Sequence, residues 1–474
     1  MTLPPTSTDL ETDDGHGAIR LSEVLSALSY ALDLTEGQPA GHSVRSCLIG
    51  MRIASEIGLD AADRSSLFYA LLLKDAGCSS NSAATCSFFG ADDHTVKRTW
   101  KTTDWASRWN SFTHVVRNVR PGGSLLSKAR QVAGFAGAGA VGTELVRTRC
   151  ERGADIARML EMTEDTAAAI RALDEHWDGR GVPRGLAGEE IPRLARIACL
   201  AQTVEIFHAS HGLHAALGMA RERAGRWFDP DLVRALESLR GDAALWTGLA
   251  AGDAPTRAAA LEPAGRALTA DDDRLDRIAQ AFARVIDAKS PYTFRHSEGV
   301  ATYADAVGRV LGLDADALRD LRRAALLHDV GKLGVSNRIL DKPGKLTEEE
   351  FAVVRRHPEH TYQILSRVSR FRDLAETAAS HHERMDGRGY HRGIAAGTLP
   401  VAARVLAVAD VCDALSAERP YRAALPRERV LQIMRGDAGT ALCPDCFAGL
   451  ETALEDRPEL GLDGAETGFS AGNL

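Results

Sequence analysis

Hydrophobic side chains recur along much of the chain at intervals of three and four residues, the spacing of one face of a helix. A clear example in the second half consists of Leu275, Ile278, Phe282, Val285 and Ile286. Thr347 followed by Glu350 has the form of a capping box and predicts the start of another helix. Convincing strand-like runs are absent. The pattern therefore predicts an all-α protein.

One sequence module is written twice in the chain. Residues 174–207 align without gaps to residues 382–415. The spacing upstream agrees as well, since an interval of 32 residues separates His42 from Lys74 and His296 from His328. A repeat of this kind predicts two structural units of the same type.

The first copy carries an insertion of 46 residues, because 75 residues separate Lys74 from Arg149 whereas 29 separate His328 from His357. The insertion includes the basic, tryptophan-bearing stretch VKRTWKTTDWASRWNSF. Such a stretch could contact a partner, a nucleic acid or a membrane surface. We favour the commoner arrangement, an amphipathic cover over a neighbouring helix.

The repeat also sets the expected domain limits. These are a disordered tail at residues 1–17, a first helical bundle at 18–240, a linker at 241–271, a second bundle at 272–455 and a tail at 456–474. The linker is inferred from a segment rich in Gly, Ala, Pro and Asp.

Composition limits the partners and the cellular compartment that we expect for the protein. A net charge of -8 argues against a general nucleic-acid binder, whose footprint is basic. The N-terminal residues lack the features of a signal or transit peptide, and no apolar run is long enough for a membrane span, so we expect a cytoplasmic protein. The eight cysteines then indicate buried thiols, and Cys443 and Cys446 are interpreted as two thiols at a helix start.

The second copy carries a set of five imidazoles and two carboxylates. They are His296, His328, Asp329, His357, His381, His382 and Asp410. This set suits two divalent metal ions, because a carboxylate can bridge two cations while histidines from separate helices fill other positions. Such a centre would acidify a bound water and attract a phosphodiester.

A lone histidine on a helix is more often a satisfied core or surface residue than a ligand. Packing gives no reason, however, for the pairs His-Asp, His-His and Ala-Asp to follow one another in this order. Adjacent helical residues diverge by about 100°. The pairs at residues 328–329 and 381–382 can therefore face one centre more easily if the helix is locally irregular.

Three cationic side chains near these pairs could bind phosphate. Lys332 lies one turn beyond His328, where it could instead be a cation at a helix C-terminus; we favour phosphate binding. Arg419 and Arg422 are suited to bidentate phosphate contacts, and the alternative for both is a solvated helix end.

At these residues the sequence resembles the HD-GYP family of metal-dependent phosphohydrolases. The resemblance covers about residues 272–446 and rests on RHS, LLHDVGKLGV, RRHPEHTYQIL, HHERMDGRGY and ADVCDALSAERPYR, in the family's order. It implies a helical bundle with a di- or trinuclear iron or manganese centre. It also implies hydrolysis of cyclic di-GMP through pGpG, often to GMP.

The resemblance implies a role for each matching residue. The seven residues of the imidazole and carboxylate set would be metal ligands, with Asp329 bridging the ions. Asp329 and Lys332 would be the catalytic residues. Lys332, Arg419 and Arg422 would bind the nucleotide phosphates, and Tyr390 would lie beside the substrate.

Two positions depart from the family pattern. His391 stands where the family has the proline of Gly-Tyr-Pro, which changes the loop near the substrate. Tyr292 stands four residues before His296, where some trinuclear members carry a glutamate. We therefore expect two metal ions, iron or manganese.

The first copy resembles a degenerate HD domain. At the seven ligand positions it has His42, Lys74, Asp75, Arg149, Leu173, Asp174 and Gln202, and Cys78 replaces the phosphate-binding lysine. Charged lysine and arginine cannot coordinate a metal, so we expect no dinuclear centre there. Instead Lys74 is expected to pair with Asp75 or Asp174, while Glu175 and the loop after it persist as scaffold.

The leading hypothesis is a cyclic di-GMP phosphodiesterase that works with two divalent ions in its C-terminal half. The N-terminal half would be regulatory or structural, and homodimer formation is left open. One alternative is an HD phosphohydrolase acting on another nucleotide or phosphoester. The other is a signalling module that senses a nucleotide with little turnover.

Overall fold

The computed structural model describes residues 19–103, 113–114, 117–119, 138–418, 423–457 and 460. Within these residues the expected all-α class is confirmed, since the strands are limited to β1 (Ile19–Arg20) and β2 (Thr269–Ala270), which pair antiparallel. In the described part, no helix is long and apolar enough to cross a membrane. The N-terminal tail and most of the C-terminal tail lie outside the described residues.

Contacts divide the chain into two units between Ala281 and Phe282, within helix α14 (Asp272–Asp287). The hydrophobic face predicted for this helix is buried throughout. The expected linker holds α12 (Ala243–Gly248) and α13 (Ala254–Ala259), and α13 packs against α1 and α2. This segment is therefore folded, and the domain limits remain a prediction.

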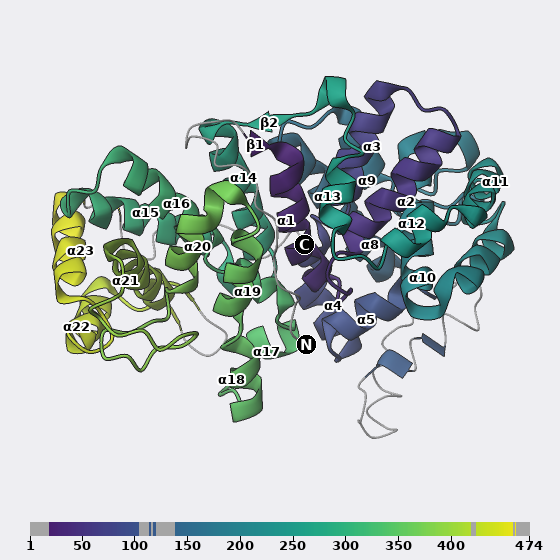
Figure 1. Cartoon of the computed structure of the whole chain (residues 1–474). Coiled ribbons are helices and arrows are strands. Elements are labelled where there is room, and N and C mark those ends of the chain that lie inside the picture. Colours follow the sequence, from purple (N-terminus) through teal and green to yellow (C-terminus); the bar gives the residue numbers. More distant parts are fainter. Residues whose placement is uncertain are drawn as a thin grey trace. The chain divides into compact units, whose positions relative to one another are not determined.

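The first unit is built mainly on α2, which packs against α3 and α10 (Figure 1). Its remaining helices follow the chain from purple to teal in that view. Their bounds are α1 Leu21–Thr35, α2 His42–Glu56, α3 Ala61–Leu73, α4 Ser82–Phe89, α5 Asp93–Trp100, α8 Ala138–Met159, α9 Glu164–Arg171, α10 Arg193–Arg223 and α11 Pro230–Ser238. The helices α4 and α5 belong to the insertion.

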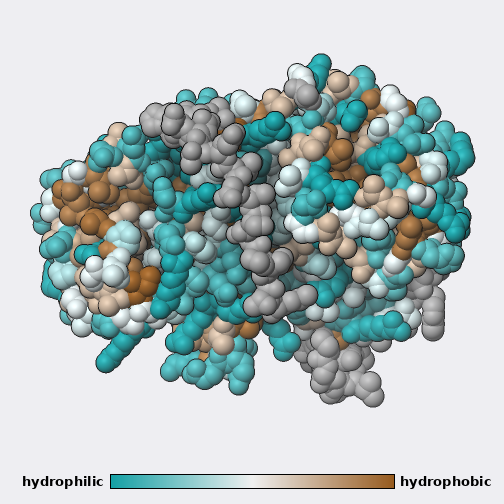
Figure 2. All heavy atoms as spheres, in the orientation of Figure 1, coloured by the Kyte–Doolittle hydropathy of each residue, from teal (hydrophilic) through white to brown (hydrophobic). Residues whose placement is uncertain are grey.

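The second unit is centred on α15, which packs against α16, α21 and α23. Its helices are α15 His296–Val310, α16 Ala315–Leu327, α17 Asn337–Leu340, α18 Glu348–Val354, α19 His357–Leu365, α20 Arg372–Ala379, α21 Val401–Ser416, α22 Arg427–Asp437 and α23 Pro444–Asp456. The capping box at Thr347 and Glu350 is confirmed as the start of α18. Figure 2 shows hydrophobic side chains gathered on the visible face over α15 and α23.

The two units use the same polar anchors at positions 254 residues apart. Asp33 accepts hydrogen bonds from the backbone and hydroxyl of Ser43 at the start of α2, as Asp287 does from Ser297 at the start of α15. The side chains of Asp60 and Asp314 likewise cap α3 and α16. These anchors fix the helices that carry the candidate site residues in both copies.

The cysteines are free thiols. Cys443 is the N-cap residue of α23, and both Cys443 and Cys446 are buried. The interpretation of this pair as two thiols at a helix start is confirmed.

Gly331 allows a very close backbone contact in the second unit. A Cβ atom at this position would lie 2.0 Å from the carbonyl oxygen of His357. Gly77 has the same role in the first unit, where a Cβ would lie 1.9 Å from the carbonyl oxygen of Arg149. In both copies, glycine lets the turn after the third helix of the repeat approach a later helix, α19 in the second unit and α8 in the first.

We predict that Gly331→Ala lowers the free energy of unfolding of the second unit by about 1–3 kcal/mol, because a backbone must move to admit the methyl group. Gly397→Ala is the matched control, since a Cβ there meets open space. Scanning calorimetry of both variants measures the difference. Equal unfolding temperatures for the two variants would contradict the prediction.

Candidate metal centre

The His-Asp pair lies where a regular helix ends. His328 is the C-cap residue of α16 and keeps helical dihedral angles, whereas Asp329 leaves them, with φ -97° and ψ 8°. A short 3₁₀ helix, η6 (Val330–Gly334), follows. The local irregularity expected from the helical geometry is therefore present, and it brings two adjacent side chains to one centre.

The other members of the set come from helix ends and from one helix interior. His296 and His357 are the first residues of α15 and α19, the pair His381-His382 follows α20, and Asp410 lies within α21. Six of the seven are almost fully buried, and the side chain of His382 is 25% exposed. The structure thus brings together all seven predicted residues.

The two oxygens of Asp329 face two different groups of histidines. Its Oδ2 lies 3.7 Å from His296 Nε2 and 3.4 Å from His328 Nε2. Its Oδ1 lies 3.4 Å from His357 Nε2 and 3.7 Å from His381 Nε2. This is the arrangement that a carboxylate bridging two cations requires.

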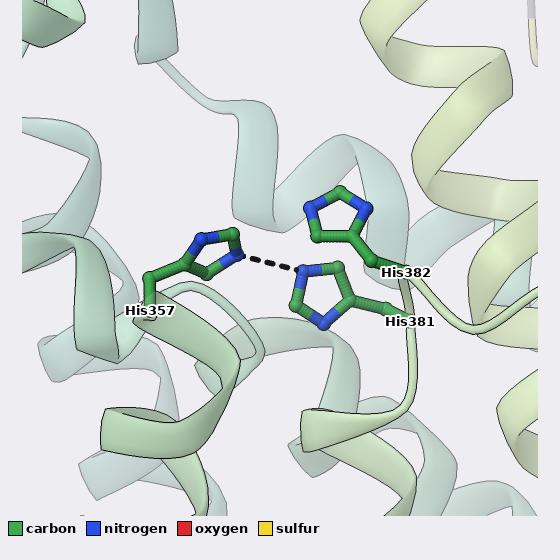
Figure 3. Close-up of side chains that lie close together, drawn as sticks. All are labelled: His357, His381 and His382. Atoms are coloured by element: carbon green, nitrogen blue, oxygen red, sulfur yellow. Dashed lines mark hydrogen bonds between the residues drawn. The ribbon is translucent and has the colours of Figure 1, made fainter. Parts of the chain in front are cut away.

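The remaining residues complete each side of the bridge. Asp410 Oδ1 lies 3.3 Å from His296 Nε2 and 3.8 Å from His328 Nε2. On the other side, Figure 3 shows the rings of His357, His381 and His382 close together, with 3.1 Å between the Nε2 atoms of His357 and His381. Two groups of ligand atoms therefore share one carboxylate.

Three of the histidines are oriented by carbonyl groups three residues earlier in the chain. The Nδ1 atoms of His328, His357 and His381 donate to Ala325, Val354 and Ala378, at 2.7, 2.7 and 2.6 Å respectively. Such a bond leaves the Nε2 lone pair of each ring free to bind a metal.

His296 is oriented by a carboxylate. Its Nδ1 lies 2.6 Å from Oδ2 of Asp413, on α21. Asp413 was not predicted from the sequence. Gly299 makes room for this carboxylate, because a Cβ there would lie 2.1 Å from Asp413 Oδ1. The available signal was the spacing Asp410-x-x-Asp413, which places both aspartates on one helical face.

The protonation states agree with a ligand role for most of the set. Burial lowers the pKa of His381 to about 4, and it holds the pKa values of His357 and His382 well below their usual range. Burial would raise the pKa of Asp329, but the nearby histidines and Lys332 outweigh it and lower that pKa well below its usual range. Neutral imidazoles and an ionised carboxylate are the forms that bind metals.

His296 differs because it faces two aspartates. Burial would lower its pKa, but hydrogen bonds with Asp410 and Asp413 raise the pKa to about 10. A metal ion on Nε2 would have to displace that proton.

The donor set fits a metal for a further reason. His328 Nε2 and Asp329 Oδ1 are buried without a hydrogen-bond partner. Buried polar atoms are costly unless they are paired. Cations bound between the imidazoles and the carboxylates would satisfy both atoms.

The structure describes two of the four predicted substrate-binding residues. Lys332 Nζ lies 2.6 Å from Asp329 Oδ2 and its side chain is 23% exposed, so it stands at the edge of the centre. The ring of Tyr390 lies 4.7 Å from that of His382, centroid to centroid. Arg419 and Arg422 lie outside the described residues.

The loop that carries Tyr390 is held by a buried glutamate. Glu383 accepts hydrogen bonds from the backbone of Arg392, Gly393 and Ile394 at 2.7, 3.2 and 2.9 Å. His391, in the family's proline position, has a positive φ of 86°. In the first copy Glu175 holds its loop through comparable bonds, which explains why this residue persists.

In the first copy, lysines neutralise the carboxylate that corresponds to Asp329. Lys74 pairs with Asp75 Oδ2, one of the two partners expected from the sequence. Lys101 Nζ, from the end of α5, lies 2.8 Å from both Asp75 Oδ1 and Glu36 Oε2. Burial would raise the pKa of Asp75, but Lys101 and Lys74 lower it well below its usual range.

Two other altered positions form an internal ion pair, because Arg149 pairs with Asp174. The retained His42 contacts Glu205 through its Nδ1. Cys78 lies near Glu36 and Asp75, but burial raises its pKa well above the usual range, so it stays a neutral thiol. The insertion therefore does more than cover a helix, because its lysine enters the former ligand cluster; Trp105 and Trp109 lie outside the described residues.

Comparison with protein families also finds one related segment in each copy of the repeat. The model of the HD domain matches residues 140–232 and 280–444, one segment in each copy. Both matched segments include the loop held by the buried glutamate.

Several similar proteins are bacterial phosphodiesterases. The 3'3'-cGAMP-specific phosphodiesterase 3 of Vibrio cholerae is 46% identical over 93% of this chain and 95% of its own. The cyclic di-GMP phosphodiesterase response regulator RpfG of Xanthomonas campestris is 39% identical over 36% of this chain and 45% of its own. A crystal structure of a cyclic GMP-AMP specific phosphodiesterase from V. cholerae matches with a TM-score of 0.64, at 42% identity over 93% of this chain and 98% of that chain.

We predict that Asp413→Ala weakens metal binding about 10- to 100-fold, because His296 loses the group that orients its ring. Metal titration of the stripped protein measures the change. Asp305→Ala is the control, since this carboxylate pairs with Arg309 on the exposed side of α15. Unchanged affinity in Asp413→Ala would show that His296 does not depend on this contact.

We also predict that Lys101→Met destabilises the first unit by about 3–5 kcal/mol, because Glu36 and Asp75 stay buried without their shared partner. All six tryptophans lie before residue 282, so tryptophan fluorescence during chemical denaturation follows this unit. The same substitution at the exposed Lys345 should have no effect. A Lys101→Met protein as stable as the Lys345→Met protein would refute the role given to Lys101.

Proposed function

The chain belongs to the HD domain family, in its HD-GYP branch of metal-dependent phosphodiesterases, and we propose that its second unit hydrolyses a 3'3'-cyclic dinucleotide with two divalent metal ions. The observation that carries this proposal is the cluster of all seven candidate ligands, in which the two oxygens of Asp329 face two groups of histidines. Iron or manganese is the metal we expect, in a protein that acts in the cytoplasm.

Different residues of the chain would bind the metal ions and the scissile phosphate. Two bound cations would neutralise the charge of the phosphodiester and lower the pKa of the attacking water. Asp329 and Asp410 would supply the negative charge that holds the cations. Lys332, at the edge of the centre, would leave Asp329 for a phosphate oxygen and stabilise the charge that develops there.

We propose 3'3'-cGAMP as the preferred substrate. The supporting observation is the 46% identity to a 3'3'-cGAMP-specific enzyme along nearly the whole chain, including the degenerate first copy. Cyclic di-GMP, expected from the sequence, is the second candidate, because two relatives named for that substrate match 36% and 39% of the chain.

The first unit contributes no catalysis in this proposal. Lys74, Lys101 and Arg149 lie in its former ligand cluster and neutralise the carboxylates that a cation would otherwise pair with. Its role would be structural or regulatory for the second unit.

The test is turnover of 3'3'-cGAMP, cyclic di-GMP and other phosphoesters, with metal content measured on the same sample. We expect about two equivalents of metal per chain and faster cleavage of 3'3'-cGAMP. The Asp329→Ala variant should lose metal and activity together, whereas Asp305→Ala should keep both. A protein with two metals that binds cyclic dinucleotides without cleaving them would instead be a sensing module.

A further inference from the structure

Arg355 is an exposed cation beside the candidate metal centre that no role above uses. It is the C-cap residue of α18 and precedes His357 by two positions. Its guanidinium carbon lies 4.4 Å from the ring centroid of Phe351 and 5.6 Å from that of Tyr390. Two aromatic rings therefore hold the guanidinium in place through cation–π contacts.

The guanidinium of Arg355 has no carboxylate within ion-pair distance among the described residues. Its neighbours differ in this respect. Arg356 Nε lies 3.8 Å from Glu359, and Arg392 pairs with Glu376. The five donors of Arg355 thus remain available to a ligand from solvent.

Tyr390 connects Arg355 to the metal centre. The same ring that lies under the guanidinium lies 4.7 Å from the ring of His382 and 6.5 Å from that of His357. His382 is the most exposed of the seven ligands. Arg355 therefore stands on the open side of the centre, one aromatic ring away from the ligands.

We propose that Arg355 binds the phosphate of the cyclic dinucleotide that is not being cleaved. The inference rests on the proposed function, because such a substrate carries two phosphodiesters and Lys332 stands at the one held by the metal centre. Arg419 and Arg422, which the resemblance also assigns to the phosphates, lie outside the described residues, whereas Arg355 is a described cation outside the ligand cluster. A planar guanidinium fixed by aromatic rings presents parallel donors to two phosphate oxygens and loses little freedom on binding.

The test compares two substrates that differ in the second phosphate. Arg355→Gln should lower kcat/KM for 3'3'-cGAMP by about 10- to 100-fold, mainly by raising KM, since a charge-assisted contact to bound substrate is lost. Turnover of bis(4-nitrophenyl) phosphate, which has a single phosphodiester, should stay within about twofold, and metal content should not change. Arg356→Gln is the matched control and should behave as wild type on both substrates.

Other outcomes overturn the inference in recognisable ways. A fall in bis(4-nitrophenyl) phosphate turnover or in metal content would mean that Arg355 only supports Tyr390 and the ligands. A much larger loss for 3'3'-cGAMP than for cyclic di-GMP would mean that it reads a base, because both substrates have the same two phosphates. Wild type that cleaves bis(4-nitrophenyl) phosphate but no cyclic dinucleotide would refute the proposed function and this inference together.

Discussion

A buried carboxylate at the end of the third helix of each repeat organises both units. Asp329 and Asp75 are each 1% exposed, and an ionised carboxylate in such a place is costly unless positive charge and hydrogen bonds compensate it. In the second unit, imidazoles from α15, α16, α19 and the segment after α20 surround Asp329 and can hold cations there. In the first unit, Lys74 and Lys101 supply the charge directly.

The fold around this carboxylate is the same whether histidines or lysines surround it. Asp33 and Asp287 accept hydrogen bonds from serines at equivalent positions of the two copies. Gly77 and Gly331 allow equivalent close backbone contacts. A histidine with a carboxylate on its Nδ1 also survives in both copies, although Glu205 replaces Asp413. The first copy could therefore lose its metal ligands and keep its fold, because backbone anchors and internal ion pairs carry the structure.

Hydrophobic spacing predicted the helical class, and the paired residues of the second copy indicated the seven candidate ligands that the structure brings together. The repeat indicated that Lys74 pairs with Asp75 or Asp174, because it showed which ligand position the lysine occupies. Lys101 could not be found in this way, since it comes from an insertion that has no counterpart in the second copy. Asp413 was within reach through its spacing from Asp410. Arg355 was not, because an arginine beside a histidine motif gains meaning only from the rings of Phe351 and Tyr390 that lie against it.

The difference in charge source is consistent with the proposal that only the second copy is catalytic. An ammonium group neutralises a carboxylate but offers no coordination position for water or a phosphate oxygen, and Lys101 is only 8% exposed. A metal ion held by several protein ligands can keep such positions open. Lys332 and His382, 23% and 25% exposed, give solvent access to the second centre. The buried carboxylate is thus covered by lysine in the first unit, whereas the cluster around Asp329 in the second unit is partly exposed to solvent.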